Sequence, residues 1–162
     1  MKNVVPVRKA LGVRTVFNIL GPLLNPAGLK RALIGVYSEA MVPLMAHALH
    51  ALGAELVMVV FCGGLDELAP IAVATVATVT PSGVEMGTLD PFELGFSKCT
   101  IDDLKGGTAV DNAAILRAVL SGEHSGPVVD TVVLNAGAGL YVAGVAASVS
   151  YTHLTLPTIC SV

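Results

Sequence analysis

Two adjacent carboxylates, Asp66 and Glu67, follow a pair of glycines in the segment Gly63-Gly64-Leu65-Asp66-Glu67. Neighbouring side chains on a strand point to opposite faces, but a loop loosened by glycine lets both turn toward one centre. Mg²⁺ is typically held by one or two carboxylates together with substrate phosphates. The local pattern leaves two interpretations open, a magnesium site and a solvated acidic turn.

The segment 8–26, RKALGVRTVFNILGPLLNP, places arginines and asparagines in an otherwise apolar run. A guanidinium held among apolar residues can form paired hydrogen bonds with a carboxylate or a phosphate. Arg8 and Arg14 are therefore candidates for binding an anionic ligand. The alternative is that both only pair with an acid or close a surface.

Other polar patterns are weaker. His47 and His50 have i, i+3 spacing but no third metal ligand is spaced to join them, so we expect them at the surface or the edge of the core. Gly106 and Gly107 precede a helix without either of the common phosphate-loop spacings, which makes a phosphate loop there a weak hypothesis. The three cysteines lack metal or disulfide spacing and fit a reducing cytoplasm.

The residues around the acidic pair predict its position. The compact apolar runs 31–37 and 55–61 indicate buried strands, and 38–52 has one apolar face, with Ser38 as its expected cap. A strand, a helix and a strand with short joints form a βαβ unit with parallel strands, so the fold class is α/β. The acidic pair then follows the carboxyl end of a strand, where open α/β sheets bind ligands.

The rest of the chain predicts a mixed, largely parallel sheet flanked by helices. Residues 71–89 indicate an antiparallel hairpin around Pro81-Ser82-Gly83, and 90–107 a loop with one or two helical turns. Thr108 and Asp111 form a capping-box variant at the start of a helix that Gly122 ends. A further helix from Pro127 to about Gly144 is apolar on nearly every face, which predicts burial all round.

Composition excludes some partners. The net charge of −3 comes from 9 basic and 12 acidic residues that form no block, so a nucleic acid is not expected. The beginning of the chain lacks the apolar core of a secretory signal. Residues 131–151 are uncharged over the length of a bilayer span, but alanine, glycine and Asn135 dilute their hydrophobicity, so we expect no membrane segment.

Several blocks, taken together, resemble the anthranilate phosphoribosyltransferases: RKALGVRTVFNILGPLLNPA, RALIGVY, GGLDELAP, LDPFELGF, LKGGTAVDNAAILRAVLSG and VVLNAGAGLYVAG, in this order. The resemblance implies a Mg²⁺-dependent enzyme of tryptophan biosynthesis. It transfers the phosphoribosyl group of phosphoribosyl pyrophosphate to anthranilate and releases pyrophosphate. By the same resemblance, Asp66 and Glu67 hold Mg²⁺ on the pyrophosphate, Arg8 meets the anthranilate carboxylate and Gly21 lines that pocket. No catalytic base is assigned.

The resemblance also has departures. The family's helical N-terminal domain, its phosphoribosyl pyrophosphate loops and its dimer contacts would all lie before Met1, so we expect this chain to be inactive alone and the full-length enzyme to be a homodimer. Phe61 and Cys62 replace the usual His-Gly, and Leu24 a common threonine. We expect residues 1–149 to form the α/β catalytic domain and 150–162 to be a tail foreign to the family, a sequence artefact.

Two other functions stay open. One is a non-catalytic binding or interaction module with the same fold, and the other is an enzyme similar to the pyrimidine nucleoside phosphorylases. The phosphoribosyltransferase hypothesis predicts that Asp66 and Glu67 face Arg8 across one cleft at the carboxyl ends of the strands.

Overall fold

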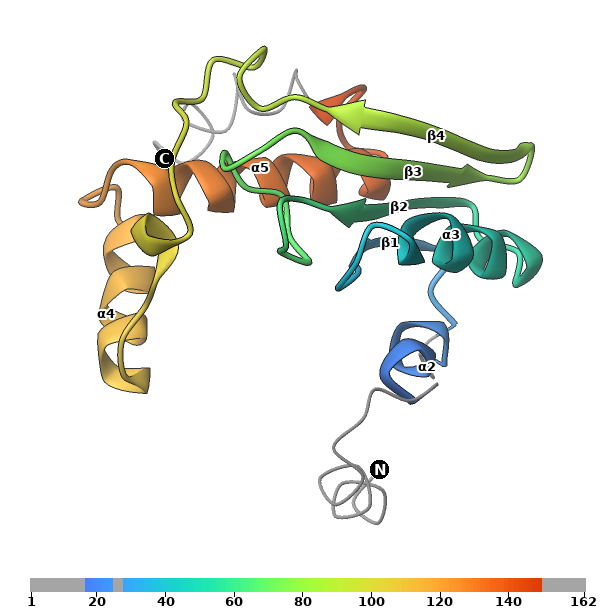
Figure 1. Ribbon diagram of the computed structural model, residues 1–162, viewed down its shortest axis with the longest axis horizontal. Helices are drawn as coiled ribbons and strands as arrows, with labels where there is room; N and C mark the ends of the chain where they lie inside the picture. The colour runs from blue at the N-terminus through green and yellow to red at the C-terminus, as the bar shows by residue number, and fades with distance from the viewer. Residues whose placement is uncertain (1–16, 25–27, 150–162) are drawn as a thin grey trace.

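A four-stranded sheet carries helices on both of its faces in the computed structural model, which describes residues 17–24 and 28–149. Helix α3 packs on one face and α5 on the other (Figure 1). The elements in chain order are α2 (Phe17–Leu23), β1 (Arg31–Gly35), α3 (Met41–Ala51), β2 (Leu56–Phe61), β3 (Ala74–Thr80), β4 (Gly83–Leu89), the 3-10 turn η1 (Asp102–Leu104), α4 (Ala109–Leu120) and α5 (Pro127–Ala143).

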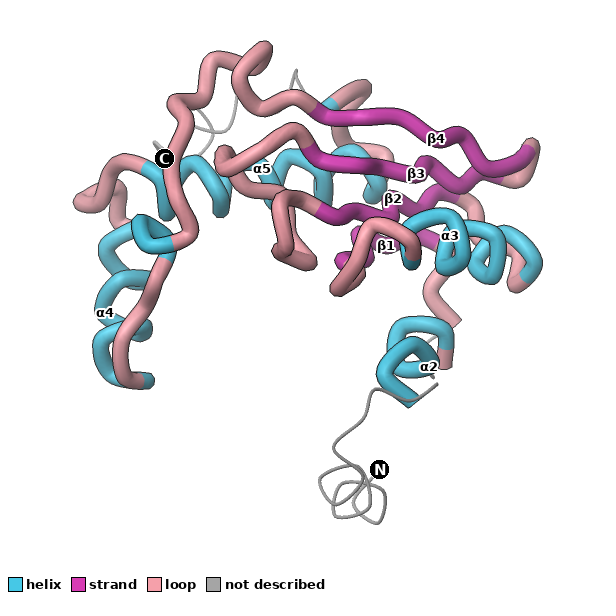
Figure 2. Tube along the Cα trace, in the orientation of Figure 1, coloured by secondary structure: helices cyan, strands magenta, loops and turns pink. Residues whose placement is uncertain are grey.

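The sheet has the order β1-β2-β3-β4 (Figure 2). β1 and β2 are parallel, with Arg31 opposite Leu56 and Gly35 opposite Val60, which confirms the βαβ unit. β2 with β3 and β3 with β4 are antiparallel, which confirms the hairpin. The mixed α/β sheet is thus as predicted, but antiparallel pairing has a larger share among the described strands than expected, because the chain after β2 turns back instead of crossing over.

The core lies on both faces of the sheet. In β2, Val57 and Val59 contribute to the cluster under α3, whereas Met58 and Val60 contribute to the cluster under α5. Alternate side chains of a strand point to opposite faces, so a strand covered on both sides needs apolar residues at every position. This explains why residues 56–61, LVMVVF, show no polar alternation.

Helix α5 runs back along the sheet toward the beginning of β1. The Arg31 guanidinium donates to the Val142 carbonyl at 3.4 Å and lies 3.5 Å from the Glu55 carboxylate. Leu134, Ala138 and Val142 are buried against the sheet, but the opposite side of the helix is partly exposed, so the prediction of burial all round is wrong. A helix on an outer layer has only one covered face. No helix in the described part of the chain is long and apolar enough to cross a membrane.

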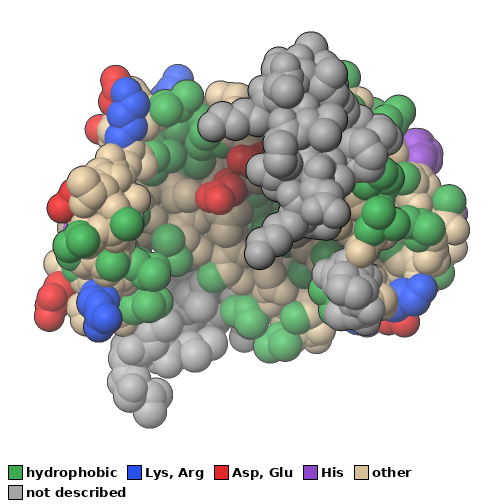
Figure 3. Space-filling model, turned by 90° about the horizontal axis from the view of Figure 1, so that it is seen from below, with side chains coloured by type: hydrophobic (Ala, Val, Ile, Leu, Met, Phe, Trp, Pro, Cys, Tyr) green, Lys and Arg blue, Asp and Glu red, His purple; other side chains and the backbone are tan. Residues whose placement is uncertain are grey.

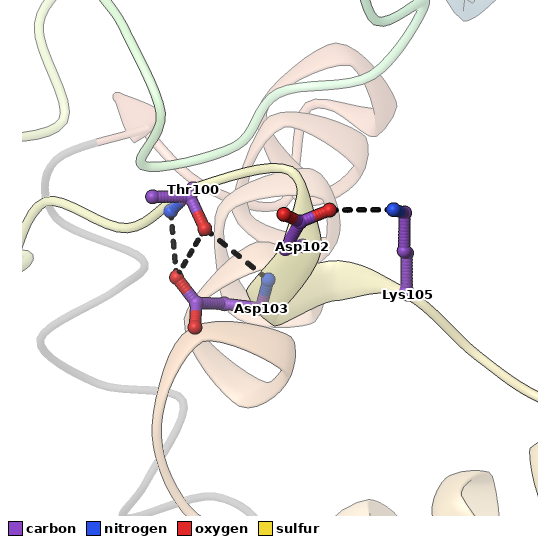
Figure 4. A network of polar contacts seen from close by, with 4 residues as sticks. All are labelled: Thr100, Asp102, Asp103 and Lys105. Carbon is purple, nitrogen blue, oxygen red and sulfur yellow. Dashed lines mark hydrogen bonds and ion pairs between the residues drawn. The ribbon is translucent and has the colours of Figure 1, made fainter.

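Two Thr–Asp pairs close the helical turns that precede α5. Thr108 caps α4 and its hydroxyl donates to the Asp111 carboxylate at 2.7 Å, which confirms the capping box. Thr100 and Asp103 repeat the arrangement at η1, beside the ion pair of Asp102 with Lys105 (Figure 4). The expected helical turn within 90–107 is therefore present.

The expected N-cap of the helix after β1 lies two residues before the observed one. α3 begins at Met41, its N-cap is Ala40, and no side chain caps it. Ser38 contributes its carbonyl, which accepts from the Met41 N–H at 3.0 Å. A tight turn therefore replaces the side-chain cap that the sequence suggested.

Replacing Thr108 by alanine should loosen the first turn of α4. Hydrogen bonds from Thr108 lower the pKa of the Asp111 carboxyl, so its contribution to stability is present above the ordinary Asp pKa of about 3.9 and is lost as the pH falls through the lowered value. At pH 7 we expect exchange of the Asp111 and Asn112 amides, which bond to Thr108, to be about fivefold faster in Thr108→Ala. Hydrogen exchange followed by NMR measures this.

The matched control is Thr100→Ala, which removes the corresponding Thr–Asp hydrogen bond beside η1 and should leave α4 unchanged. Because protonation of Asp111 removes the bond in the parent protein too, the difference between the parent and Thr108→Ala should shrink below about pH 4. Equal protection of α4 in both proteins at pH 7 would contradict this role of the capping box.

Candidate active site

The chain leaves β2 through a two-residue turn made of Gly63 and Gly64. The Cys62 N–H donates to the Leu65 carbonyl at 3.0 Å, and the Leu65 N–H donates to the Cys62 carbonyl at 2.9 Å. Gly63 has φ +55° and Gly64 has φ +99°, and two successive positive φ angles are typical of a type I′ turn. Residues with a side chain rarely adopt these backbone angles. The glycine pair therefore sets the direction in which the chain continues to Asp66 and Glu67.

Directly after this turn the backbone of Asp66 crosses the end of β1. A Cβ atom built on Gly35 would lie 1.5 Å from the Asp66 carbonyl oxygen, far inside van der Waals contact. Only glycine therefore permits this crossing. It fixes Asp66 at the carboxyl ends of both parallel strands, where the sequence predicted the acidic pair.

The residues after the acidic pair are buried and anchored. Leu68 is fully buried, and Asn135 of α5 forms hydrogen bonds with its backbone. The Cys62 thiol donates to the carbonyls of Ala69 at 3.2 Å and Ala72 at 3.3 Å. Gly35, Cys62 and Asn135 were not predicted as site residues. The segment is thus held on both sides of Asp66 and Glu67.

The two carboxylates themselves are exposed. Neither forms a hydrogen bond or an ion pair with another residue that the structure describes. They lie at a pocket of about 380 Å³ whose other walls are mainly apolar, formed by Leu65, Leu104, Val128, Thr131 and Val132. Figure 3 shows acidic side chains in a hollow at the middle of this face, with hydrophobic side chains next to them.

This donor set suits a cation that brings other ligands with it. Within the described ranges, no group of three or more His, Cys, Asp or Glu residues could hold a metal ion. Mg²⁺ does not need such a cage, because one or two carboxylates, water and substrate phosphates complete its six oxygen ligands. Asp66 and Glu67 fit that pattern.

The titratable groups nearest α5 do not provide a nucleophile. Burial raises the pKa of the Cys99 thiol, and the negative charges of Asp103 and Asp130 raise it further. Burial also raises the pKa of Asp130 in the first turn of α5. A thiol with a raised pKa is a poor nucleophile because the thiolate is the reactive form. Cys99 is therefore a structural residue.

The other predicted site residues have different outcomes. Arg8 and Arg14 lie outside the described residues, so the expected position of Arg8 opposite the acidic pair stays a prediction. Gly21 lies in α2, is exposed, and has open space where a Cβ would be. The end of α2 packs near the beginning of β2, where Pro22 and Leu23 line a pocket with Leu49 and Val57, and no α2 residue lines the pocket of the acidic pair. The role of Gly21 therefore stays a prediction.

The two weaker motifs have internal hydrogen-bond partners. His47 is exposed, and the half-buried His50 ring lies 3.0 Å from the Thr80 carbonyl, as expected for residues at the edge of the core. The phosphate-loop hypothesis at Gly106 and Gly107 is wrong. The Gly107 N–H donates to the Asn112 side chain at 2.8 Å, and the next N–H donates to the capping carboxylate at 2.9 Å. Two backbone donors at this position are thus already used, one of them by a negatively charged carboxylate.

The family model described as "Glycosyl transferase family, a/b domain" matches residues 1–155. The chain belongs to this family. The chain is similar to the anthranilate phosphoribosyltransferase of Rubrobacter xylanophilus. The two are 51% identical over 92% of this chain and 44% of the relative. Another similar protein is the anthranilate phosphoribosyltransferase of Shewanella frigidimarina, with 43% identity over 99% of this chain and 47% of the relative.

Solved structures agree with this membership. Anthranilate phosphoribosyltransferase from Thermus thermophilus superposes with a TM-score of 0.86 and 42% identity over 99% of this chain and 47% of that protein. The Saccharomyces cerevisiae enzyme in complex with PRPP and Mg has a TM-score of 0.83 and 30% identity over 95% of this chain and 45% of that protein. This glycosyl transferase family chain thus spans less than half the length of the relatives it matches.

Gly35→Ala should displace the acidic pair, because the new methyl group would overlap the Asp66 carbonyl. Overpacking of this kind typically costs about 1–3 kcal/mol, so we expect the free energy of unfolding to fall by at least that amount. Urea unfolding measures it.

Gly87→Ala in β4 is the control, since nothing lies within 4 Å of a Cβ there. It should change stability by less than about 0.5 kcal/mol. If the two variants were equally stable, the close crossing would be absent in solution.

Proposed function

We propose that the chain is the α/β catalytic part of an anthranilate phosphoribosyltransferase. The reaction is transfer of the phosphoribosyl group from phosphoribosyl pyrophosphate to anthranilate, giving N-(5-phosphoribosyl)-anthranilate and pyrophosphate in tryptophan biosynthesis. The observation that carries the proposal is the exposed Asp66–Glu67 pair, which has no partner among the described residues and lies at the carboxyl edge of a sheet with this family's fold. A cytoplasmic homodimer, as the resemblance suggests, is the proposed form of the complete protein.

The acidic pair has a defined role in this reaction. Asp66 and Glu67 would supply carboxylate oxygens to Mg²⁺, and water and pyrophosphate would supply its other ligands. When bound, Mg²⁺ neutralises the charge that builds on the leaving pyrophosphate. The backbone anchors on either side hold the carboxylates in place, which lowers the reorganisation that the reaction requires.

Arg8 and Gly21 are proposed to bind the nucleophile. The Arg8 guanidinium can form paired hydrogen bonds with the anthranilate carboxylate, and the backbone at Gly21 lines the same pocket. The reacting amine is a neutral aniline that attacks a ribosyl carbon with developing positive charge. Such a reaction depends on orientation and leaving-group stabilisation, so the proposal includes no catalytic base.

Support comes from the names of the similar proteins. The curated relatives are anthranilate phosphoribosyltransferases, and the yeast structures include complexes with PRPP and Mg and with 4-fluoroanthranilate. Because these proteins are more than twice as long as this chain, we assign turnover to the complete protein. We expect this chain by itself to bind ligands without catalysing the transfer.

Calorimetric titration of the chain with pyrophosphate in the presence of Mg²⁺ tests the metal site. Asp66→Asn and Glu67→Gln should each weaken binding by at least about tenfold, which is roughly 1.4 kcal/mol, because each removes an anionic ligand. Glu85→Gln removes an exposed carboxylate from β4 instead and should bind like the parent chain. A non-catalytic module would not bind pyrophosphate at all. If the parent chain did not bind Mg²⁺–pyrophosphate, the proposal would be overturned.

Arg8→Met tests the anthranilate pocket separately. Losing paired, charge-assisted hydrogen bonds should weaken anthranilate binding about 10- to 100-fold, while Mg²⁺–pyrophosphate binding stays unchanged. Fluorescence titration with anthranilate measures the first and calorimetry the second. Binding of a pyrimidine nucleoside in preference to anthranilate would favour the nucleoside phosphorylase-like alternative.

A further inference from the structure

Asn135, in the middle of α5, binds a single residue of the loop after β2 at two points. Its Oδ1 accepts from the Leu68 N–H at 3.1 Å, and its Nδ2 donates to the Leu68 carbonyl at 2.7 Å. The same Nδ2 donates to the Thr131 carbonyl at 2.8 Å, one turn earlier in α5. An N–H must donate and a carbonyl must accept, so this arrangement fixes the orientation of the amide.

Leu68 comes immediately after Asp66 and Glu67 and differs from them in solvent exposure. Both carboxylate residues are exposed, whereas Leu68 is fully buried under α5. Its backbone belongs to no strand or helix, so the amide of Asn135 supplies partners that regular structure does not. Leaving these buried backbone groups without partners would destabilise the loop.

The acidic pair is therefore confined between two fixed points. On one side, the Asp66 carbonyl packs against Gly35 at the end of β1. On the other, Asn135 holds Leu68 to α5, the helix whose Val128, Thr131 and Val132 line the same pocket as the carboxylates. Asn135 itself does not line that pocket, so it acts on the site through the backbone of Leu68.

We propose that Asn135 is a positioning residue for the metal site: by binding both backbone groups of Leu68, it sets where Asp66 and Glu67 present their carboxylates to Mg²⁺-bound pyrophosphate. The proposal rests on the proposed function of the acidic pair. An outer contact that orients metal ligands typically changes metal affinity 10- to 100-fold when it is lost. A residue that only filled space under the loop would change stability and not affinity.

Two substitutions separate these roles. Asn135→Leu keeps a similar size and removes all three hydrogen bonds. Asn135→Asp keeps the shape, but an ionised carboxylate cannot donate to the carbonyls of Leu68 and Thr131, whereas its protonated form can donate one hydrogen bond. We expect the folded variants to bind Mg²⁺–pyrophosphate about 10- to 100-fold more weakly at pH 7.5.

Arg31→Met is the matched control. It removes the hydrogen bond from β1 to the other end of α5 and leaves the loop untouched. It should lower the melting temperature without changing the affinity for Mg²⁺–pyrophosphate. Asn135 variants that are folded and bind like the parent would overturn the proposal.

Hydrogen exchange of the parent chain tests the contact without any substitution. The Leu68 amide should be strongly protected, and the Glu67 amide much less so. Free exchange at Leu68 would overturn the proposal even if the variants did not fold. Failure of the parent chain to bind Mg²⁺–pyrophosphate would instead overturn the proposed function, so the two failures are distinguishable.

Discussion

The backbone after β2 crosses the last residue of β1 so closely that no side chain fits at Gly35. This contact depends on the parallel pairing of β1 and β2, which brings both carboxyl ends to one edge of the sheet. The Gly63–Gly64 turn directs the chain toward the crossing, and α5 closes it from the other face. The position of Asp66 and Glu67 follows from these three constraints together.

The site combines a fixed backbone with free carboxylates. Cys62, Leu68 and Asn135 are buried or hydrogen-bonded around the loop, yet the acidic side chains have no partner in the described part of the chain. Exposed carboxylates on a fixed backbone suit a cation that arrives with its own phosphate ligands.

Side chains of α4 bind the backbone just before the helix. Asn112 accepts from the Gly107 N–H and Asp111 accepts from the Thr108 N–H. Helix formation is thereby stabilised without a ligand. Among the described residues, the candidate ligands for a metal ion are the carboxylates in the loop after β2.

The sequence by itself determined the local elements. The apolar runs at 31–37 and 55–61, the hairpin and the Thr108 capping box all depend on neighbouring residues, and the structure contains each of them. It also placed the acidic pair after a strand. Tertiary structure alone decided what holds that pair. Gly35 meets Asp66, and Asn135 meets Leu68, 67 positions away. The one-sided burial of α5 likewise depended on which elements cover it. Such contacts depend on how the sheet and helices pack, and no short-range pattern encodes them.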